Sequence, residues 1–269
     1  MTGSRIRRAI AAICLAAVFY LILTSRIEAR LEMLVFDVGQ GDAILLDDGH
    51  GNQILVDGGP DDGILSRLGQ TLPWHDRRIE VVVVTHPDAD HLSGLLAVLD
   101  RYAVDTILEY IPEPPETGLF LAWRERVVAE GSVVLTAESG MQLQTGNGFS
   151  LDVFVPDPPL SAENDNSIML SLRRDGHCLA LLTGDAGVAE ERGWLVSGQA
   201  KACEVLKIGH HGSKTSTSVE LLQLLQPERG VISVGADNRY GHPHPDVLAR
   251  LSGLSLHRTD QQGTFRISW

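Results

Sequence analysis

The sequence predicts an α+β or α/β domain in which two mixed β-sheets pack face to face and helices cover their outer sides. Two observations lead to this fold class. Short runs of Val, Ile and Leu, such as Val81–Val84, lack polar alternation, as in strands that are buried on both faces. The chain also opens with strand hairpins and then alternates strands with helices, an order that two packed sheets with outer helices satisfy.

The individual elements follow from short apolar runs that are separated by Gly, Asp and Pro. Strands are expected at 32–36, 43–46, 53–56, 80–85, 132–135, 151–155, 167–172, 178–182, 204–208, 231–234 and 264–268. Helical periodicity is found near 64–72, 92–101, 119–129, 188–196, 219–226 and 246–251. No linker divides these elements, so residues 31–269 are predicted to form one domain.

Composition excludes several classes of protein. Of the 269 residues, 43% are hydrophobic and 21% are charged, values that exclude global disorder. The formal net charge is -13; residues 1–30 carry five Arg and one Glu, so residues 31–269 carry -17. A body this acidic is not a general nucleic-acid binder held by a basic face. Three cysteines (Cys14, Cys178 and Cys203) are too few for a disulfide scaffold.

The N-terminal segment is expected to be a membrane anchor. Arg5, Arg7 and Arg8 precede residues 9–23, which carry no charge. At ~1.5 Å per residue this run is shorter than the ~30 Å hydrocarbon core, as in a minimal span or a signal peptide. We expect residues 1–30 to be an uncleaved signal anchor, with a cleaved signal peptide or a buried core helix as alternatives. Either of the first two places residues 31–269 outside the cytoplasm.

The strongest chemical motif is Thr85–His91 (THPDADH), directly after a predicted buried strand. His86 and Asp88 can face one metal ion while Asp90 and His91 face a second. Such two-metal clusters lower the pKa of water and clamp the oxygens of an ester. The alternative is a capping loop with Asp88 or Asp90 at the helix N-cap, which explains one aspartate and neither histidine.

Two further motifs end predicted strands. Asp185 follows Thr183–Gly184, where a carboxylate either bridges two cations or forms a turn. His210 and His211 follow the next strand along the chain. Adjacent side chains point in different directions, so one histidine can bind metal while the other meets substrate. A packed, hydrogen-bonded pair is the alternative.

Together these motifs resemble the metallo-β-lactamase superfamily, whose members carry an HxHxDH motif. The chain is most similar to the metallohydrolase domain of ComEC-type DNA-uptake proteins over residues 33–269. Four segments carry this closer resemblance: Phe36–Ala43 (FDVGQGDA), Ile54–Gly59 (ILVDGG), Asn164–Ser167 (NDNS) and Tyr240–Pro245 (YGHPHP). The resemblance implies an αββα sandwich.

The resemblance also implies two metal sites that share Asp185. Site one would contain His86, Asp88, Asp185 and an amide from Asn164 or Asn166. Site two would contain Asp90, His91, Asp185 and His210. Asp57, Asp42 and Ser167 would support these ligands from behind. Aspartate and asparagine stand where the wider superfamily has histidines, which favours Mn²⁺, with Zn²⁺ as the alternative.

By the same resemblance, Asp90, His211, His242 and His244 would take part in catalysis, by hydrogen bonding to phosphate or by proton transfer. His242 and His244 could equally be loop histidines braced by prolines. Lys207, Ser213, Lys214 and Arg239 would meet an anionic substrate. The alternatives for these four are solvated charges and, for Ser213, helix capping.

The implied function is an exported two-metal hydrolase that cleaves phosphodiester bonds in DNA, through a hydroxide bridging the metals, beside a competence channel partner. The non-imported, single strand would be the substrate. A first alternative keeps the site but hydrolyses a small phosphodiester or another ester, and the charge of -17 favours it. A second is a non-catalytic DNA-uptake accessory.

Overall fold

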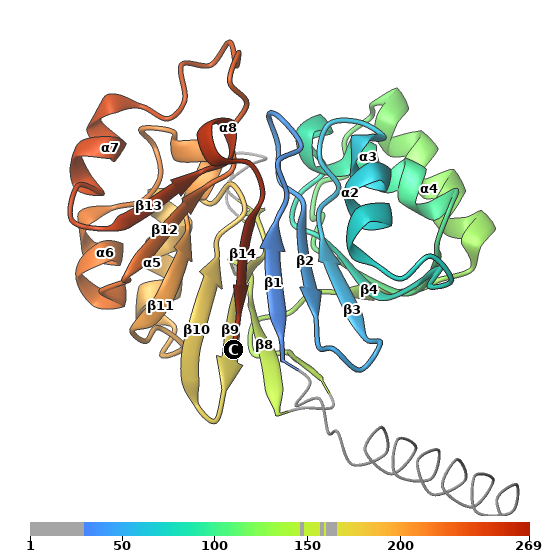
Figure 1. Cartoon of the computed structure of the whole chain (residues 1–269), viewed down its shortest axis with the longest axis horizontal. Coiled ribbons are helices and arrows are strands. Elements are labelled where there is room, and N and C mark those ends of the chain that lie inside the picture. The colour runs from blue at the N-terminus through green and yellow to red at the C-terminus, as the bar shows by residue number, and fades with distance from the viewer. Residues whose placement is uncertain (1–29, 146–147, 157–158, 160–165) are drawn as a thin grey trace, which may run out of the picture. The chain divides into compact units, whose positions relative to one another are not determined.

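Two seven-stranded sheets form the centre of the computed structural model, which describes residues 30–145, 148–156, 159 and 166–269 (Figure 1). The first sheet has the order β14 (Phe265–Ser268), β1 (Glu32–Val35), β2 (Ile44–Asp47), β3 (Gln53–Val56), β4 (Arg78–Val84), β5 (Ala103–Glu109), β6 (Val133–Thr136). The second has the order β13 (Ser255–Arg258), β12 (Arg229–Ile232), β11 (Cys203–Lys207), β10 (His177–Leu182), β9 (Met169–Arg174), β8 (Phe149–Phe154), β7 (Gln142–Gln144). Each sheet has an antiparallel part and a parallel part, so both are mixed, as predicted.

The principal helices cover the outer faces of the two sheets (Figure 1). The first sheet carries α2 (Gly63–Thr71), α3 (Ala89–Leu99) and α4 (Gly118–Glu130); the second carries α5 (Val188–Val196), α6 (Val219–Leu225) and α7 (Pro245–Arg250). A four-residue helix, α8 (Thr259–Gln262), precedes β14. The predicted arrangement of two mixed sheets with outer helices is confirmed.

Strand β4 illustrates why its sequence lacks polar alternation. Val83 and Val81 pack into the apolar core between the two sheets. Val82 and Val84 pack into the core beneath α2, α3 and α4. Both faces of the strand therefore contact apolar layers, and its C-terminal end is held rigidly where the THPDADH motif begins.

Strands β5, β7 and β13 and the four-residue helix α8 were not predicted from the sequence. Strand β5 contains Asp105 and Thr106, which interrupt its apolar pattern; Asp105 forms an ion pair with Arg78 on the neighbouring strand β4. Strand β7 has three residues, and β13 reads SLHR without a β-branched residue. Backbone pairing with neighbouring strands, which the sequence does not display, defines these elements.

Strand β6 forms one edge of the first sheet and pairs only with β5. Its four side chains are all exposed, and Val133 is 59% exposed.

Among the described residues, no helix is both long and apolar enough to cross a membrane. The anchor predicted within residues 1–30, including the apolar run 9–23, lies outside the described residues apart from Arg30.

A disulfide joins Cys178 to Cys203 and so connects the adjacent parallel strands β10 and β11. The cysteine count argued against a disulfide scaffold, and a spacing of 25 residues carries no sequence signature. The two residues face each other only because the strands pair in this register. The disulfide lies in the sheet from whose strand ends Asp185 and the adjacent histidines project.

Replacing both cysteines with Ser is expected to lower the free energy of unfolding by about 3 kcal/mol, because the open chain regains the entropy of a loop of this length. Urea unfolding measures the difference. A reductant should lower the stability of the parent to that of the Cys178→Ser/Cys203→Ser variant and leave the variant unchanged. Equal stability of the parent and the variant without reductant would contradict the expectation.

Candidate metal centre

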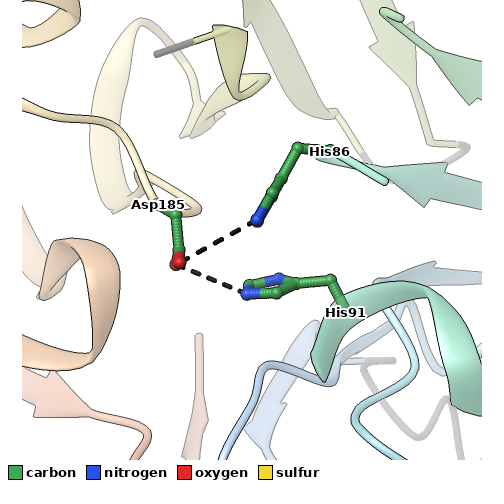
Figure 2. A group of neighbouring side chains, drawn as sticks. All are labelled: His86, His91 and Asp185. Atoms are coloured by element: carbon green, nitrogen blue, oxygen red, sulfur yellow. Dashed lines mark ion pairs between the residues drawn. The ribbon is translucent and has the colours of Figure 1, made fainter. Parts of the chain in front are cut away.

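Motifs from both sheets meet at one end of the sandwich. His86 follows β4, and Asp90 and His91 lie in the first turn of α3. Asp185 follows β10, while His210 and His211 form the short 3-10 helix η2 (Gly209–Gly212) after β11. Figure 2 shows His86, His91 and Asp185 pointing toward one another from these separate segments.

Asp185 lies at the centre of the histidine cluster. Its Oδ1 is 3.4 Å from His91 Nε2 and 3.6 Å from His211 Nε2. Its Oδ2 is 3.6 Å from His210 Nε2 and 3.9 Å from His86 Nε2. These distances exceed those of good hydrogen bonds. Ligand atoms about 2.1 Å from a shared tetrahedral cation are roughly this far apart, so the spacing fits a metal centre.

The buried polar atoms of the cluster support the same conclusion. His86 Nε2, His91 Nε2, His211 Nε2 and Asp185 Oδ1 are buried and have no hydrogen-bond partner among the described residues. Leaving such atoms unsatisfied is costly, and coordination of a cation would satisfy them. The donors fall into overlapping groups, His86–His91–Asp185 and Asp90–His91–His211. Imidazole and carboxylate donors in this number fit two divalent cations.

Asp88 and Asp90 lie on opposite parts of this cluster. Asp88 Oδ2 is 3.6 Å from His86 Nε2, and Asp90 Oδ2 is 3.4 Å from His211 Nε2. Asp88 occupies the N-cap position of α3, but its side chain makes no capping hydrogen bond. The capping alternative therefore does not account for either carboxylate.

The structure places the two adjacent histidines on different parts of the cluster. The resemblance implied His210 in site two and His211 in catalysis. Both line the pocket, but His211 lies with Asp90 and His91, whereas His210 lies by Asp185 Oδ2. Both residues have left-handed backbone conformations, with φ of 48° and 53°. This turn sets the direction of each side chain, and it is not visible in the sequence.

Asp57 supports His91 from behind. Its Oδ2 is 2.8 Å from His91 Nδ1 and also accepts a hydrogen bond from Thr85 Oγ1, while its Oδ1 accepts one from the Thr85 amide. With Nδ1 of His91 donating to this carboxylate, Nε2 is left to face Asp185. The contact therefore selects the tautomer that a metal ligand needs.

Asp57→Asn is expected to weaken metal binding by about 10- to 100-fold, because an amide NH₂ facing His91 favours the wrong tautomer. Metal titration by calorimetry measures the change. Asp62→Asn, at an exposed aspartate without a side-chain capping bond, is the matched control and should bind like the parent. Unchanged affinity in Asp57→Asn would show that the contact does not orient the ligand.

Lys207 does not have the position expected of a substrate contact. It is fully buried, its Nζ is 2.7 Å from Asp42 Oδ2, and it donates a hydrogen bond to the Ile208 carbonyl. Asp42 Oδ1 lies 3.5 Å from His211 Nδ1, which contacts the Ser233 carbonyl at 2.9 Å. Lys207 therefore neutralises the carboxylate behind His211 instead of facing the pocket.

Ser167 lies between the two strand ends, as a supporting residue should. Its hydroxyl accepts a hydrogen bond from the Asp185 amide and lies 3.4 Å from His86 Nδ1. Asn166 is buried immediately before it. Asn164 lies outside the described residues, so the structure does not distinguish the two asparagines.

Several expected substrate or catalytic residues lie apart from the pocket. Ser213 is buried against Thr215, and Ser218, not Ser213, caps α6. Lys214 is exposed and does not line the pocket. His244 caps α7, because its Nδ1 accepts a hydrogen bond from the Asp246 amide.

Two buried glutamates on α5, Glu190 and Glu191, support the site and were not predicted from the sequence. Glu190 accepts hydrogen bonds from the amides of Ser167 and Gly187. Glu191 accepts one from the Ser218 amide, in the segment that follows the adjacent histidines. Both fix segments next to the cluster. Acidic residues in the first turn of a helix are usually exposed and interact with the helix dipole, so the sequence alone does not indicate that these two glutamates are buried.

The cluster opens into a pocket of about 130 Å³. Six of its eight lining residues were expected to bind metal or act in catalysis, and the other two, Gln40 and Tyr240, were not. The lining consists of Gln40, Asp88, Asp90, Asp185, His210, His211, Tyr240 and His242. His242 lies in the loop between β12 and α7, with its ring 5.7 Å from that of His210.

Charges inside the cluster compensate one another. Burial disfavours a charged His91, but the carboxylates of Asp185 and Asp57 outweigh it and raise the pKa of His91 well above its usual value. Burial likewise opposes ionisation of Asp90, yet His211 and His91 lower the pKa of Asp90 to about 2. For His210 and His242, burial lowers the pKa. The carboxylates are thus ionised at neutral pH, as metal ligands must be, and a bound cation would replace the proton that this environment favours on His91.

This two-sheet fold, with a buried His/Asp cluster at the strand ends, defines a class of proteins that bind metal ions at one end of the sandwich. Residues 36–236 match the family described as the metallo-beta-lactamase superfamily, and the chain belongs to that superfamily.

Sequence comparison relates the chain to competence proteins. It is 30% identical over 280 residues to ComE operon protein 3 of Bacillus subtilis (strain 168), covering 94% of this chain and 35% of that protein. It is 28% identical over 238 residues to Recombination protein 2 of Haemophilus influenzae, covering 87% and 28%, and 29% identical over 194 residues to Competence protein ComA of Neisseria gonorrhoeae, covering 71% and 25%. The chain thus spans about a third or less of these relatives, and the resemblance to the ComEC-type group is confirmed.

Solved structures share the fold at low sequence identity. The metallo-beta-lactamase fold protein YhfI from Bacillus subtilis matches with a TM-score of 0.60 and 10% identity, covering 89% of this chain and all of that one. Zn²⁺-bound PqqB from Methylobacterium extorquens matches with a TM-score of 0.58 and 12% identity, covering 87% and 99%. These matches support the fold assignment alone.

Proposed function

We propose that residues 31–269 form a two-metal hydrolase that cleaves phosphodiester bonds in DNA. The observation that carries this proposal is the position of Asp185, whose two oxygens face different histidines, His91 and His211 on one side and His86 and His210 on the other. One carboxylate can thereby serve two cations, Mn²⁺ or Zn²⁺. Similarity to competence proteins supports DNA as the substrate.

The chain would hold one cation with His86, Asp88 and Asp185, and the other with Asp90, His91, His211 and Asp185. Bound cations of this kind lower the pKa of water and offset charge that develops on a phosphate. Asp57 and the Asp42–Lys207 pair keep the ligands in place from behind.

His242 is placed to act on the leaving group. It lies at the rim of the pocket, and its Nδ1 is buried without a hydrogen-bond partner among the described residues. An imidazole at this position can hydrogen bond to a leaving group and exchange a proton with it. We assign His242 the transfer of a proton to the departing oxygen.

The second candidate function is hydrolysis of a small phosphodiester or another ester. The charge of -17 on residues 31–269 favours it, because an extended duplex finds no basic surface. A single DNA strand that presents one phosphate at a time avoids most of this repulsion. We therefore retain DNA, in single-stranded form, as the proposed substrate.

Export, membrane attachment through residues 9–23 and cooperation with a competence channel remain part of the proposal. The Cys178–Cys203 disulfide is typical of proteins in oxidising compartments outside the cytoplasm. The similarity to competence proteins, of which the chain spans about a third or less, supports cooperation with a channel.

The test uses the purified full chain and end-labelled single-stranded DNA, with Mn²⁺ or Zn²⁺. Cleavage that a chelator abolishes and that either cation restores is the expected result. Intact DNA in the presence of two bound cations per chain would overturn the nuclease proposal. The same preparation should then be assayed with small phosphodiesters, because their cleavage would support the second candidate.

A further inference from the structure

A second hollow adjoins the metal-centre pocket. It measures about 380 Å³ and shares Gln40, Asp90 and Tyr240 with that pocket, so the two hollows are direct neighbours. We call this second hollow the outer compartment. Its full lining is Gln40, Pro60, Ala89, Asp90, Asp237, Asn238, Arg239 and Tyr240. A substrate whose phosphate lies among the cluster residues would place its next group in the outer compartment.

The outer compartment has one aromatic wall with a cation beside it. Tyr240 is 55% exposed, and the Arg239 guanidinium carbon lies 5.3 Å from the centroid of its ring. The Tyr240 and His242 rings are stacked with centroids 5.9 Å apart. Tyr240 thus lies between the outer compartment and His242, which lines the metal-centre pocket.

Hydrogen bonds fix the conformation of the loop at residues 235–242, which contains Tyr240. The Asn238 side-chain amide donates hydrogen bonds to the carbonyls of Gly235 and His242, and its Oδ1 accepts one from the His242 amide. The side chain of Gln40, which lines both hollows, accepts a hydrogen bond from the Gly235 amide. The Tyr240 ring is therefore presented by a braced loop, and little ordering is required when a ligand stacks on it.

We infer that the outer compartment is a nucleobase subsite, in which Tyr240 stacks on the base next to the scissile phosphate and Arg239 contacts the neighbouring phosphate. This inference rests on the proposed function and specifies its substrate as an unpaired strand. The volume suits one flat group, and the mixture of Pro60, Ala89 and Tyr240 with polar Gln40 and Asp237 suits a base better than an acyl chain. Stacking is also sequence-tolerant, since every base has an aromatic face.

The test compares binding of two tetranucleotides with the same phosphates, dT4 and its abasic counterpart. The full chain is titrated with each at one salt concentration, with Ca²⁺ added in place of Mn²⁺ or Zn²⁺, and calorimetry gives both dissociation constants. We expect dT4 to bind roughly tenfold more tightly than the abasic strand, as one base–aromatic stack allows. Equal binding of the two strands by the parent would overturn the inference.

Three variants separate the contributions of the two side chains. Tyr240→Leu should bring the ratio of the two dissociation constants close to one, whereas Tyr240→Phe should retain it, because the ring and not the hydroxyl stacks. Arg239→Gln should weaken both strands by a similar factor, since it removes a phosphate contact. A ratio that survives in Tyr240→Leu would also overturn the inference.

The outcomes distinguish this inference from the proposed function. DNA cleavage together with equal binding of dT4 and the abasic strand would refute the nucleobase subsite and leave hydrolysis standing. A preference for dT4 that depends on Tyr240, without cleavage under either cation, would support the subsite and refute the nuclease.

Discussion

Asp185→Asn is expected to lower kcat/KM for metal-dependent DNA cleavage by roughly 10³-fold, the scale found when a preorganised charge contact is removed from an active site. The amide is neutral and offers one oxygen where the carboxylate offers two. Since Oδ1 faces His91 and His211 and Oδ2 faces His86 and His210, the change impairs both halves of the centre. Initial rates on labelled DNA and the number of cations per chain by elemental analysis measure the effect.

Asp175→Asn is the matched control for this experiment. Asp175 lies between β9 and β10, its side chain is 83% exposed, and asparagine tolerates its left-handed backbone, with φ of 50°. This variant should retain the rate and the cation content of the parent. If Asp185→Asn keeps both cations and full activity, the carboxylate does not bridge the two sites.

Lys207→Met is expected to lower the free energy of unfolding by about 3–5 kcal/mol, because it leaves the Asp42 carboxylate buried without its partner. Asp42 is 1% exposed and Lys207 is fully buried, so solvent cannot replace the lost charge. Urea unfolding of the parent and the variant measures the difference.

The double variant Lys207→Met/Asp42→Asn separates charge from packing. It should recover part of the loss, because no uncompensated charge remains in the interior. Lys201→Met is the matched control, because Lys201 is exposed and lies just before β11. This change should leave the free energy of unfolding within about 0.5 kcal/mol of that of the parent. A loss of less than 1 kcal/mol in Lys207→Met would show that Asp42 finds another partner or is protonated.

The buried strand β4 and the candidate ligands that follow it could be predicted from the sequence, because short local patterns encode both. The uninterrupted valines of β4 identified a strand buried on both faces, and the THPDADH motif at its end identified the candidate ligands. Each of these signals occupies a few consecutive residues. They therefore survive without any knowledge of tertiary contacts.

Other features depend on contacts between distant segments. The left-handed turn that directs His211 and not His210 toward Asp90 is held by the long-range contact with Ser233. From the sequence alone, Lys207 is expected to be an exposed charge. Its burial depends on the ion pair with Asp42, which is distant in the sequence. The disulfide likewise depends on strand register. No pattern within one segment could have predicted these contacts.

The exposed edge strand β6 has a consequence for the behaviour of the protein in solution. Along its outer side, backbone amides and carbonyls remain available, and Val133, Val134 and Leu135 add apolar surface without a lysine or proline to discourage pairing. Copies of the domain at high concentration are therefore expected to associate edge to edge through this strand, ahead of any other described surface. We therefore expect the β6 edge to determine self-association and solubility, whereas the metal-centre pocket is formed by other segments.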